Sequence, residues 1–155
     1  MQNFYKKGMT LAELLIIFAI IGLLVLVVLP QFSKIRENQT LKSGAEDVLS
    51  AISKARSQTL ASVNSSEYGV HFQSDRVIIF KGTVFSAMAG DNEIINITAP
   101  VTISDVTLLG VSETSGDVYF NRLSGAPSKN GTITLSTPSI SKVITISATG
   151  VANLD

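Results

Sequence analysis

Residues 14–29 form an uncharged, mostly aliphatic run that directly follows a single carboxylate, Glu13. Together with residues 9–13, this run is long enough to span a bilayer as a helix, which takes about 20 residues. A carboxylate at the mouth of such a helix is costly to bury and marks a functional position by default. The chain must therefore place this segment in lipid or against other apolar surfaces, and Glu13 is its first candidate functional residue.

Two simpler interpretations of the apolar run compete. A cleaved secretory signal has a shorter apolar core and a small-x-small cleavage site after it, whereas residues 29–32 here contain no small side chain. A plain membrane anchor explains the length of the run but leaves Glu13 unexplained. Lys6 and Lys7 precede the run, so the positive-inside tendency places the N-terminus in the cytoplasm and the bulk of the chain outside.

Composition limits the remaining possibilities. The chain has 155 residues, enough for one membrane helix and one small domain. Its 12 basic and 12 acidic side chains give no net charge, so no basic surface is expected to attract nucleic acid. Cysteine is absent, which excludes disulfides and thiolate chemistry. An exported domain of this chain must be held together by packing alone.

Beyond Pro30 the apolar residues continue at helical spacing. They recur three or four positions apart on one face, at Phe32, Ile35, Leu41, Ala45, Val48, Leu49, Ile52, Ala55, Leu60 and Val63. We therefore expect one helix from about residue 10 to about residue 61, with an amphipathic second half. The polar segment 62–67 is expected to end it.

From Tyr68 onward the apolar period changes to two. Seven short segments rich in Val, Ile, Thr and aromatic residues read as strands, at 68–72, 76–81, 94–103, 106–111, 117–121, 131–136 and 142–148. Tight connections are expected at 73–75 and 137–141. The predicted fold class is α+β, with the long N-terminal helix packed on a C-terminal antiparallel β-sandwich.

The N-terminal order of residues resembles that of type IV pilin-like proteins, which carry a class III (prepilin) signal. Two lysines and Gly8 precede Met-Thr-Leu-Ala-Glu-Leu at residues 9–14, and the apolar run follows. The resemblance implies a leader at 1–8, a membrane-spanning segment at 9–30, an amphipathic helix at 31–62 and an extracytoplasmic β-domain at 63–155. It also implies a pilin-like fold.

The same resemblance implies a chemistry for the N-terminus. Prepilin peptidase is expected to cut between Gly8 and Met9 and to N-methylate Met9, although most members have Phe where this chain has Met9. Glu13 then neutralises the N-terminal amine of an adjacent subunit, which is favourable where water is scarce. Gly22 and Pro30, which weaken a helix, match the segment that stretches or melts when pilin subunits assemble.

The C-terminal part narrows the resemblance to the minor pseudopilins and minor pilins of the GspH/FimT type. The matching segments are 55–58, 68–72, 79–80, 118–120, 131–135, 144–146 and 149–150, whereas residues 82–116 carry no family signal. A subunit of a type II secretion pseudopilus or a type IV pilus is therefore expected in the inner membrane and then in the filament. Its implied partners are the peptidase, other pilin-like subunits, the assembly platform protein and lipid.

Three alternatives were weighed against this expectation. The first is a DNA-binding minor pilin of a natural-transformation (DNA-uptake) pilus. Some FimT-type proteins bind DNA through arginines after the glycine of the final strand, but no cation follows Gly150 here. An enzyme is disfavoured because the only histidine, His71, lies in a predicted strand, faces outward and has no acid near it in sequence. Oxygen ligands at 91–93 fit no known calcium loop, so a solvated turn is expected there. No catalytic residue, metal or cofactor is predicted.

Overall fold

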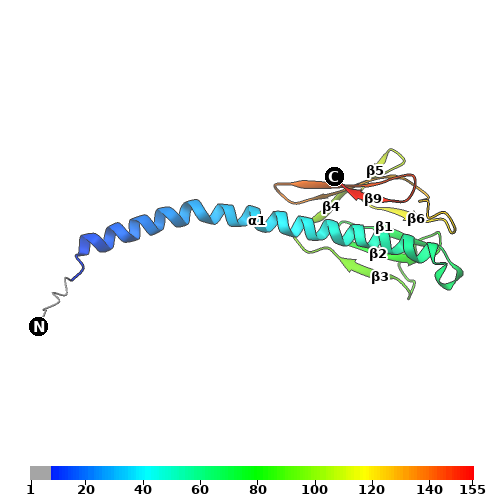
Figure 1. Cartoon of the computed structure of the whole chain (residues 1–155), viewed down its shortest axis with the longest axis horizontal. Coiled ribbons are helices and arrows are strands. Elements are labelled where there is room, and N and C mark those ends of the chain that lie inside the picture. The colour runs from blue at the N-terminus through cyan, green and yellow to red at the C-terminus, as the bar shows by residue number, and fades with distance from the viewer. Residues whose placement is uncertain (1–7) are drawn as a thin grey trace, which may run out of the picture. The chain divides into compact units, whose positions relative to one another are not determined.

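The computed structural model describes residues 8–155 (Figure 1). The predicted leader, apart from Gly8, and the two lysines Lys6 and Lys7 lie outside the described residues. The elements in chain order are α1 (Leu11–Leu60), a 3-10 turn η1 (Val63–Ser65), β1 (Tyr68–Phe72), β2 (Arg76–Lys81), β3 (Glu93–Asn96), β4 (Thr102–Leu108), β5 (Val111–Glu113), β6 (Gly116–Tyr119), β7 (Gly131–Ser136), β8 (Ser141–Ile146) and β9 (Ala152–Leu154). The predicted helix and the change to strands at Tyr68 are confirmed.

The strands form two antiparallel sheets. Sheet A has the order β3-β2-β1-β6 and sheet B the order β5-β4-β7-β8-β9. In Figure 1 the second half of α1 runs alongside β1 and β2. The buried side chains of this half and of the inner faces of both sheets belong to one hydrophobic cluster. The α+β, pilin-like fold class is therefore confirmed.

Three strand predictions need correction. The predicted strand 94–103 is two strands, because a turn closed by the Val101 amide and the Thr98 carbonyl (3.2 Å) separates β3 from β4. The predicted strand 106–111 is the end of β4, a two-residue turn and the start of β5; both turn residues, Leu109 and Gly110, have positive φ. That conformation fits a tight hairpin. The third difference is β9, which was not predicted.

The second half of α1 supplies one wall of the core. Its buried side chains recur three or four residues apart, so they form one stripe on the helix. They are Leu41, Ala45, Val48, Ala51, Ile52, Ala55 and Thr59. Four of the seven are alanine or threonine, and these small side chains let the sheets approach the helix closely. The middle of the predicted apolar face, from Leu41 to Ala55, is therefore confirmed as the inward face, whereas its predicted ends are exposed, at Phe32, Ile35, Leu60 and Val63.

Thr59 is the one polar member of the stripe, and it is fully satisfied. Its hydroxyl donates to the Ala55 carbonyl (3.0 Å) and accepts the Tyr68 amide (2.9 Å). The last turn of α1 therefore holds the first residue of β1. Between them Ser62, Asn64 and Ser65 all have positive φ, which ends the helix.

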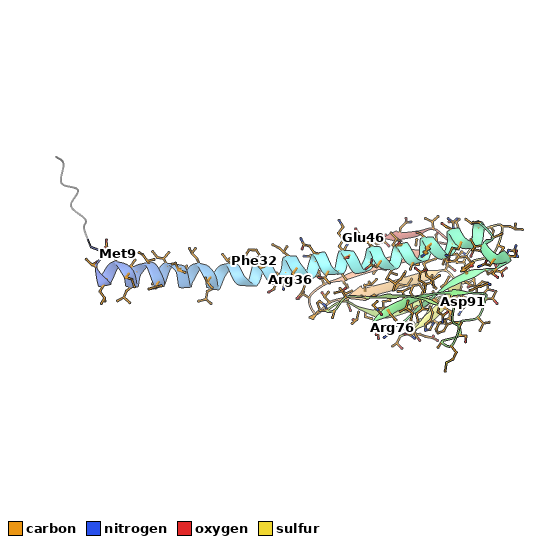
Figure 2. The ribbon with its side chains drawn as sticks, turned by 90° about the horizontal axis from the view of Figure 1, so that it is seen from below. Met9, Phe32, Arg36, Glu46, Arg76 and Asp91 are labelled. Carbon is orange, nitrogen blue, oxygen red and sulfur yellow. The ribbon has the colours of Figure 1, made fainter. Side chains whose placement is uncertain are left out.

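The first half of α1 has different surroundings. The chain divides into two compact units between Arg36 and Glu37. The large apolar side chains described between Leu11 and Val28 are 40–79% exposed, and Figure 2 shows side chains projecting from both edges of the ribbon along this stretch. By length and composition α1 could cross a membrane. The chain itself provides no cover for this apolar surface in the part that the structure describes.

Candidate assembly site on the N-terminal helix

Glu13 lies in the first turn of α1 and is bound to Thr10, the residue before the helix. The Thr10 amide donates to Glu13 Oε2 (3.0 Å), and the Thr10 hydroxyl lies 3.1 Å from the same oxygen. In return, the Glu13 amide donates to the Thr10 hydroxyl oxygen (3.2 Å). This reciprocal pattern is a capping box, in which Thr and Glu three residues apart satisfy amides that a helix start leaves unpaired.

The capping box adds a local role to Glu13 that the sequence analysis missed. The Thr-x-x-Glu spacing is a recognised sequence signal for a helix start, so the capping box could have been predicted from residues 10 and 13 alone. Both contacts from Thr10 end on Oε2, and a carboxylate has two oxygens that accept hydrogen bonds. Capping therefore holds the Glu13 side chain in place without using up its capacity for a further donor.

The predicted cleavage residues lie just outside this box. Gly8, Met9 and Thr10 precede the helix, and all three are exposed. A Cβ built on Gly8 would meet no atom of the described residues within 4 Å, so packing against residues 9–155 does not require glycine there. The Gly8–Met9 peptide bond is thus open to an enzyme, and the first helical turn starts two residues after it.

Gly22 and Pro30 both lie within the unbroken span of α1. A Cβ on Gly22 would also meet nothing within 4 Å. In the described part of the chain, packing therefore gives no reason for glycine at this position. The predicted weakness of the segment in a filament stays a prediction.

Arg56 connects the helix to two C-terminal loops, and one of them contains the 149–150 segment that contributed to the family resemblance. Its Nε donates to the Gly125 carbonyl (3.0 Å), and its Nη2 donates to the Thr149 carbonyl (3.2 Å). Gly150 has φ +81°, and a Cβ there would lie 2.1 Å from the Gly125 carbonyl oxygen and 2.9 Å from Arg56 Nε. Only glycine therefore lets the loops close around the guanidinium. We call Arg56, Gly125 and Gly150 the arginine clasp.

The clasp also bears on DNA binding. Arg56 serves its own chain, and Arg122 Nη1 donates to the Ser65 carbonyl (2.9 Å). Phosphate contacts require cationic side chains that are available to the ligand. These two arginines are already engaged within the β-domain, so their geometry does not favour the DNA-binding alternative.

His71 is less exposed than the sequence predicts, and an acid lies beside it. His71 does point away from the core, but its side chain is only 13% exposed, because the ring of Phe85 stacks on it at 3.9 Å between centroids. Its Nδ1 is paired with Asp117 Oδ1 on the adjacent strand β6, and its Nε2 lies 3.1 Å from Gln73 Nε2. The orienting acid is 46 residues away in sequence and was therefore not recognised. Both ring nitrogens make structural contacts.

Two residues of the oxygen-rich segment 91–93 make internal side-chain contacts. Glu93 forms a 2.6 Å ion pair with Lys54 of α1, and Asn92 Nδ2 donates to the Ser86 carbonyl (2.8 Å). Among the described residues there is no group of three or more His, Cys, Asp or Glu side chains that could hold a metal ion. The arrangement therefore gives calcium no cluster of carboxylates.

Comparison with known proteins agrees with this architecture. A family model described as type II transport protein GspH matches residues 44–150, from the buried half of α1 to the glycine of the arginine clasp. Residues 82–116, which carried no family signal in the sequence analysis, lie inside the match. No curated protein and no solved structure matches the chain. The match covers more than half of the chain, which therefore belongs to the GspH family of type II secretion pseudopilins, structural subunits rather than enzymes.

Proposed function

We propose that the chain is made as a prepilin, cleaved between Gly8 and Met9, N-methylated on Met9, and assembled as a minor subunit into a type II secretion pseudopilus. The observation that carries the proposal is the first half of α1. Its large apolar side chains, where the structure describes them, are exposed, and the GspH family match begins after this segment, at residue 44. A surface of this kind is stable in lipid or between the helices of neighbouring subunits.

In this proposal the subunit lies first in the inner membrane and later in the filament. Residues 9–30 span the bilayer with the N-terminus inside, and residues 63–155 lie on the far side. Residues 31–62 carry the amphipathic part of the helix. The peptidase and the assembly platform protein act on the subunit in this state, before its helix moves from lipid into the filament.

Glu13 favours the move of the helix from lipid into the filament at one position, beside the N-terminal amine of a neighbouring subunit. After cleavage the amine of Met9 is a cation near the membrane edge, and Glu13 of a neighbouring subunit is the anion that neutralises it. Pairing two opposite charges at about 4 Å gains about 4 kcal/mol at an effective dielectric of 20. Thr10 presents the Glu13 carboxylate in a fixed orientation, which lowers the entropy cost of docking.

The test is incorporation of a Glu13→Ala variant into filaments, in cells that contain the complete secretion system. The matched control is Glu46→Ala, which removes an exposed carboxylate from the second half of the same helix. We expect the Glu13 variant to stay in the membrane fraction and the Glu46 variant to reach the sheared filament fraction like the unmodified chain. Equal incorporation of both variants would refute the charge-pairing role.

A further inference from the structure

Two loops beside the end of α1 hold most of the strained backbone in the part of the chain that the structure describes. Five residues other than glycine have a positive φ there. Four of the five lie in these two loops, at Ser62, Asn64, Ser65 and Leu123. The fifth, Leu109, lies in the β4–β5 hairpin, where that conformation fits the tight turn. We call the segments 60–65 and 121–125 the strained corner.

The two segments of the strained corner touch at two points. Arg122 Nη1 donates to the Ser65 carbonyl (2.9 Å). A Cβ built on Gly125 would lie 3.1 Å from both methyl carbons of Leu60, the last residue of α1, so Leu60 lies directly over this glycine. Figure 1 shows the end of α1 and the loop after β6 at the same end of the β-domain. The strained corner is therefore one continuous surface.

This surface exposes three apolar side chains. Leu123 is 92% exposed, Leu60 is 42% exposed and Val63 is 38% exposed. Leu123 combines two unfavourable features, because a bulky side chain is disfavoured at positive φ and an apolar one is disfavoured in water. Contacts within the described residues cannot offset this cost for a side chain that is almost wholly exposed. Strain of this kind clusters where a protein holds a ligand or partner, so we take Leu123 as the anchor of an external contact.

The loop that carries Leu123 is held in place by hydrogen bonds across its base. The Asn121 amide donates to the Ala126 carbonyl (2.8 Å), and the Asn121 side-chain amide donates to the same carbonyl (3.2 Å). The Gly125 amide donates back to the Asn121 carbonyl (2.9 Å). A partner therefore does not have to order this loop on binding, which lowers the entropy cost of the contact.

The charge of this region restricts the chemistry of the partner. Residues 118–154 contain no carboxylate and three cations, Arg122, Lys129 and Lys142, although the whole chain has no net charge. Arg122 adjoins the anchor and is exposed, and the described residues use one of its five N–H donors. The contact with Ser65 thus fixes the guanidinium and leaves donors for a carboxylate. The complementary surface is an apolar recess with a carboxylate at its edge.

A neighbouring subunit of a different kind fits this chemistry. Leu60 ends the helix whose first half we propose to pack between subunits, so neighbours joined through that half carry their β-domains beside the strained corner. A minor subunit is present in few copies, so these neighbours are other pilin-like subunits. DNA is a poorer fit, because its backbone needs several available cations and offers no recess for the Leu123 side chain.

We propose that the strained corner docks on the β-domain of a different pilin-like subunit, in an apolar recess bordered by a carboxylate. Leu123 fills the recess, and Arg122 pairs with the carboxylate. The inference rests on the proposed function, because it requires the chain to be packed among other subunits. It gives a role to a strained and exposed leucine that the fold of the chain alone does not explain.

Site-specific photo-cross-linking tests the contact in cells that contain the complete secretion system. A benzophenone amino acid replaces Leu123 in the full chain, the cells are irradiated, and cross-linked products in the sheared filament fraction are identified by mass spectrometry. The matched control carries the same amino acid in place of Leu109. This leucine also has a positive φ and is 64% exposed, but it belongs to the β4–β5 hairpin.

We expect the probe at Leu123 to link the chain to another pilin-like subunit, and the probe at Leu109 to give much less of this product. Equal yields at the two positions, or a link from Leu123 to a second copy, to lipid or to DNA, overturn the inference. Filaments that contain the chain without a link at Leu123 contradict the contact but leave the proposed function intact. Absence of the unmodified chain from filaments refutes the proposed function and the contact with it.

A Leu123→Asn variant separates the contact from the stability of the fold. Asparagine tolerates positive φ, so the purified variant should unfold at the same urea concentration as the unmodified chain or at a higher one. The amount of the partner subunit that copurifies with the chain from filaments should fall by about tenfold or more, as for the truncation of an interface anchor. The control variant Leu109→Asn should retain the partner. Equal copurification by the two variants would show that Leu123 is not the anchor, and the inference would fail.

Discussion

The two halves of α1 belong to one continuous helix but differ in burial: the second half packs on the sheets, whereas the first half is exposed. In the second half a stripe from Leu41 to Thr59 is buried against two sheets, with Ala45, Val48 and Ala55 at 0% exposure. The first half is the more apolar, yet its described large side chains remain exposed. The amount of apolar surface thus does not decide burial. The presence of a complementary surface in the same chain does, and the first half must find that surface elsewhere.

Introducing a carboxylate into each half of α1 should give the largest difference between the buried half and the exposed half. Val48→Asp leaves an unpaired charge in the core, which costs about 3 to 5 kcal/mol and should unfold the β-domain. Val25→Asp lies in the exposed half and should leave domain unfolding unchanged, while it weakens membrane insertion by about 3 kcal/mol. Urea unfolding of the purified chain and membrane fractionation measure the two effects. Unfolding of the domain by Val25→Asp would break the distinction between the halves.

The arginine clasp should account for the next largest effect in the second half. Gly150 and Gly110 have almost the same φ, +81° and +82°, but a Cβ at Gly110 meets no atom within 4 Å. Gly110→Ala should cost about 1 kcal/mol for the left-handed backbone alone. Gly150→Ala should cost about 2 to 3 kcal/mol more, because it also displaces Arg56 and the Gly125 carbonyl. Equal unfolding midpoints for the two variants would contradict the clasp.

Removing the guanidinium should have a smaller effect. Arg56→Ala loses two charge-assisted hydrogen bonds to carbonyls and should destabilise the domain by about 2 kcal/mol. The control is Lys54→Ala, two residues earlier, which breaks an ion pair whose side chains are nearly half exposed and should cost no more than about 1 kcal/mol. Thermal unfolding of both variants gives the comparison. A larger loss from Lys54→Ala would place the main helix anchor at Glu93 instead.

Thr10 should give the smallest change, and only in the first half. Thr10→Val removes the hydroxyl of the capping box and should cost about 1 kcal/mol at the helix start, without altering unfolding of the β-domain. Because Thr10 positions Glu13, filament incorporation should fall, and Thr10→Ser should restore it. If Thr10→Ser incorporates no better than Thr10→Val, the hydroxyl does not position the carboxylate.

The parts of this fold that the sequence predicted are those written in local patterns. The long helix follows from its periodicity, and β1, β2 and β7 match the predicted bounds because turn residues flank them. The strand predicted at 94–103 failed because β-branched residues on both sides of Pro100 hid a break that proline signals. Proline has no amide hydrogen to give to a sheet, and β3 and β4 fall in different sheets.

Non-local pairings explain what was missed at the sites. The acid that pairs with His71 and the carbonyls that accept from Arg56 lie 46 or more residues away, so no local pattern identifies them. A local pattern marks Gly150 as no more than a turn residue, and only the folded chain shows that the Gly125 carbonyl and the Arg56 guanidinium occupy the space of a side chain there. The capping box is the exception, since its signal was local and readable.

The most direct test of the account is the intact mass of the chain in three samples. They are the membrane fraction of cells that lack prepilin peptidase, the membrane fraction of cells that contain it, and the sheared filament fraction of the latter. The account predicts the full-length mass in the first sample. In the other two it predicts the mass without residues 1–8 and with one added methyl on Met9. An uncleaved chain in the peptidase-containing cells, or one that never reaches the filament fraction, would contradict it.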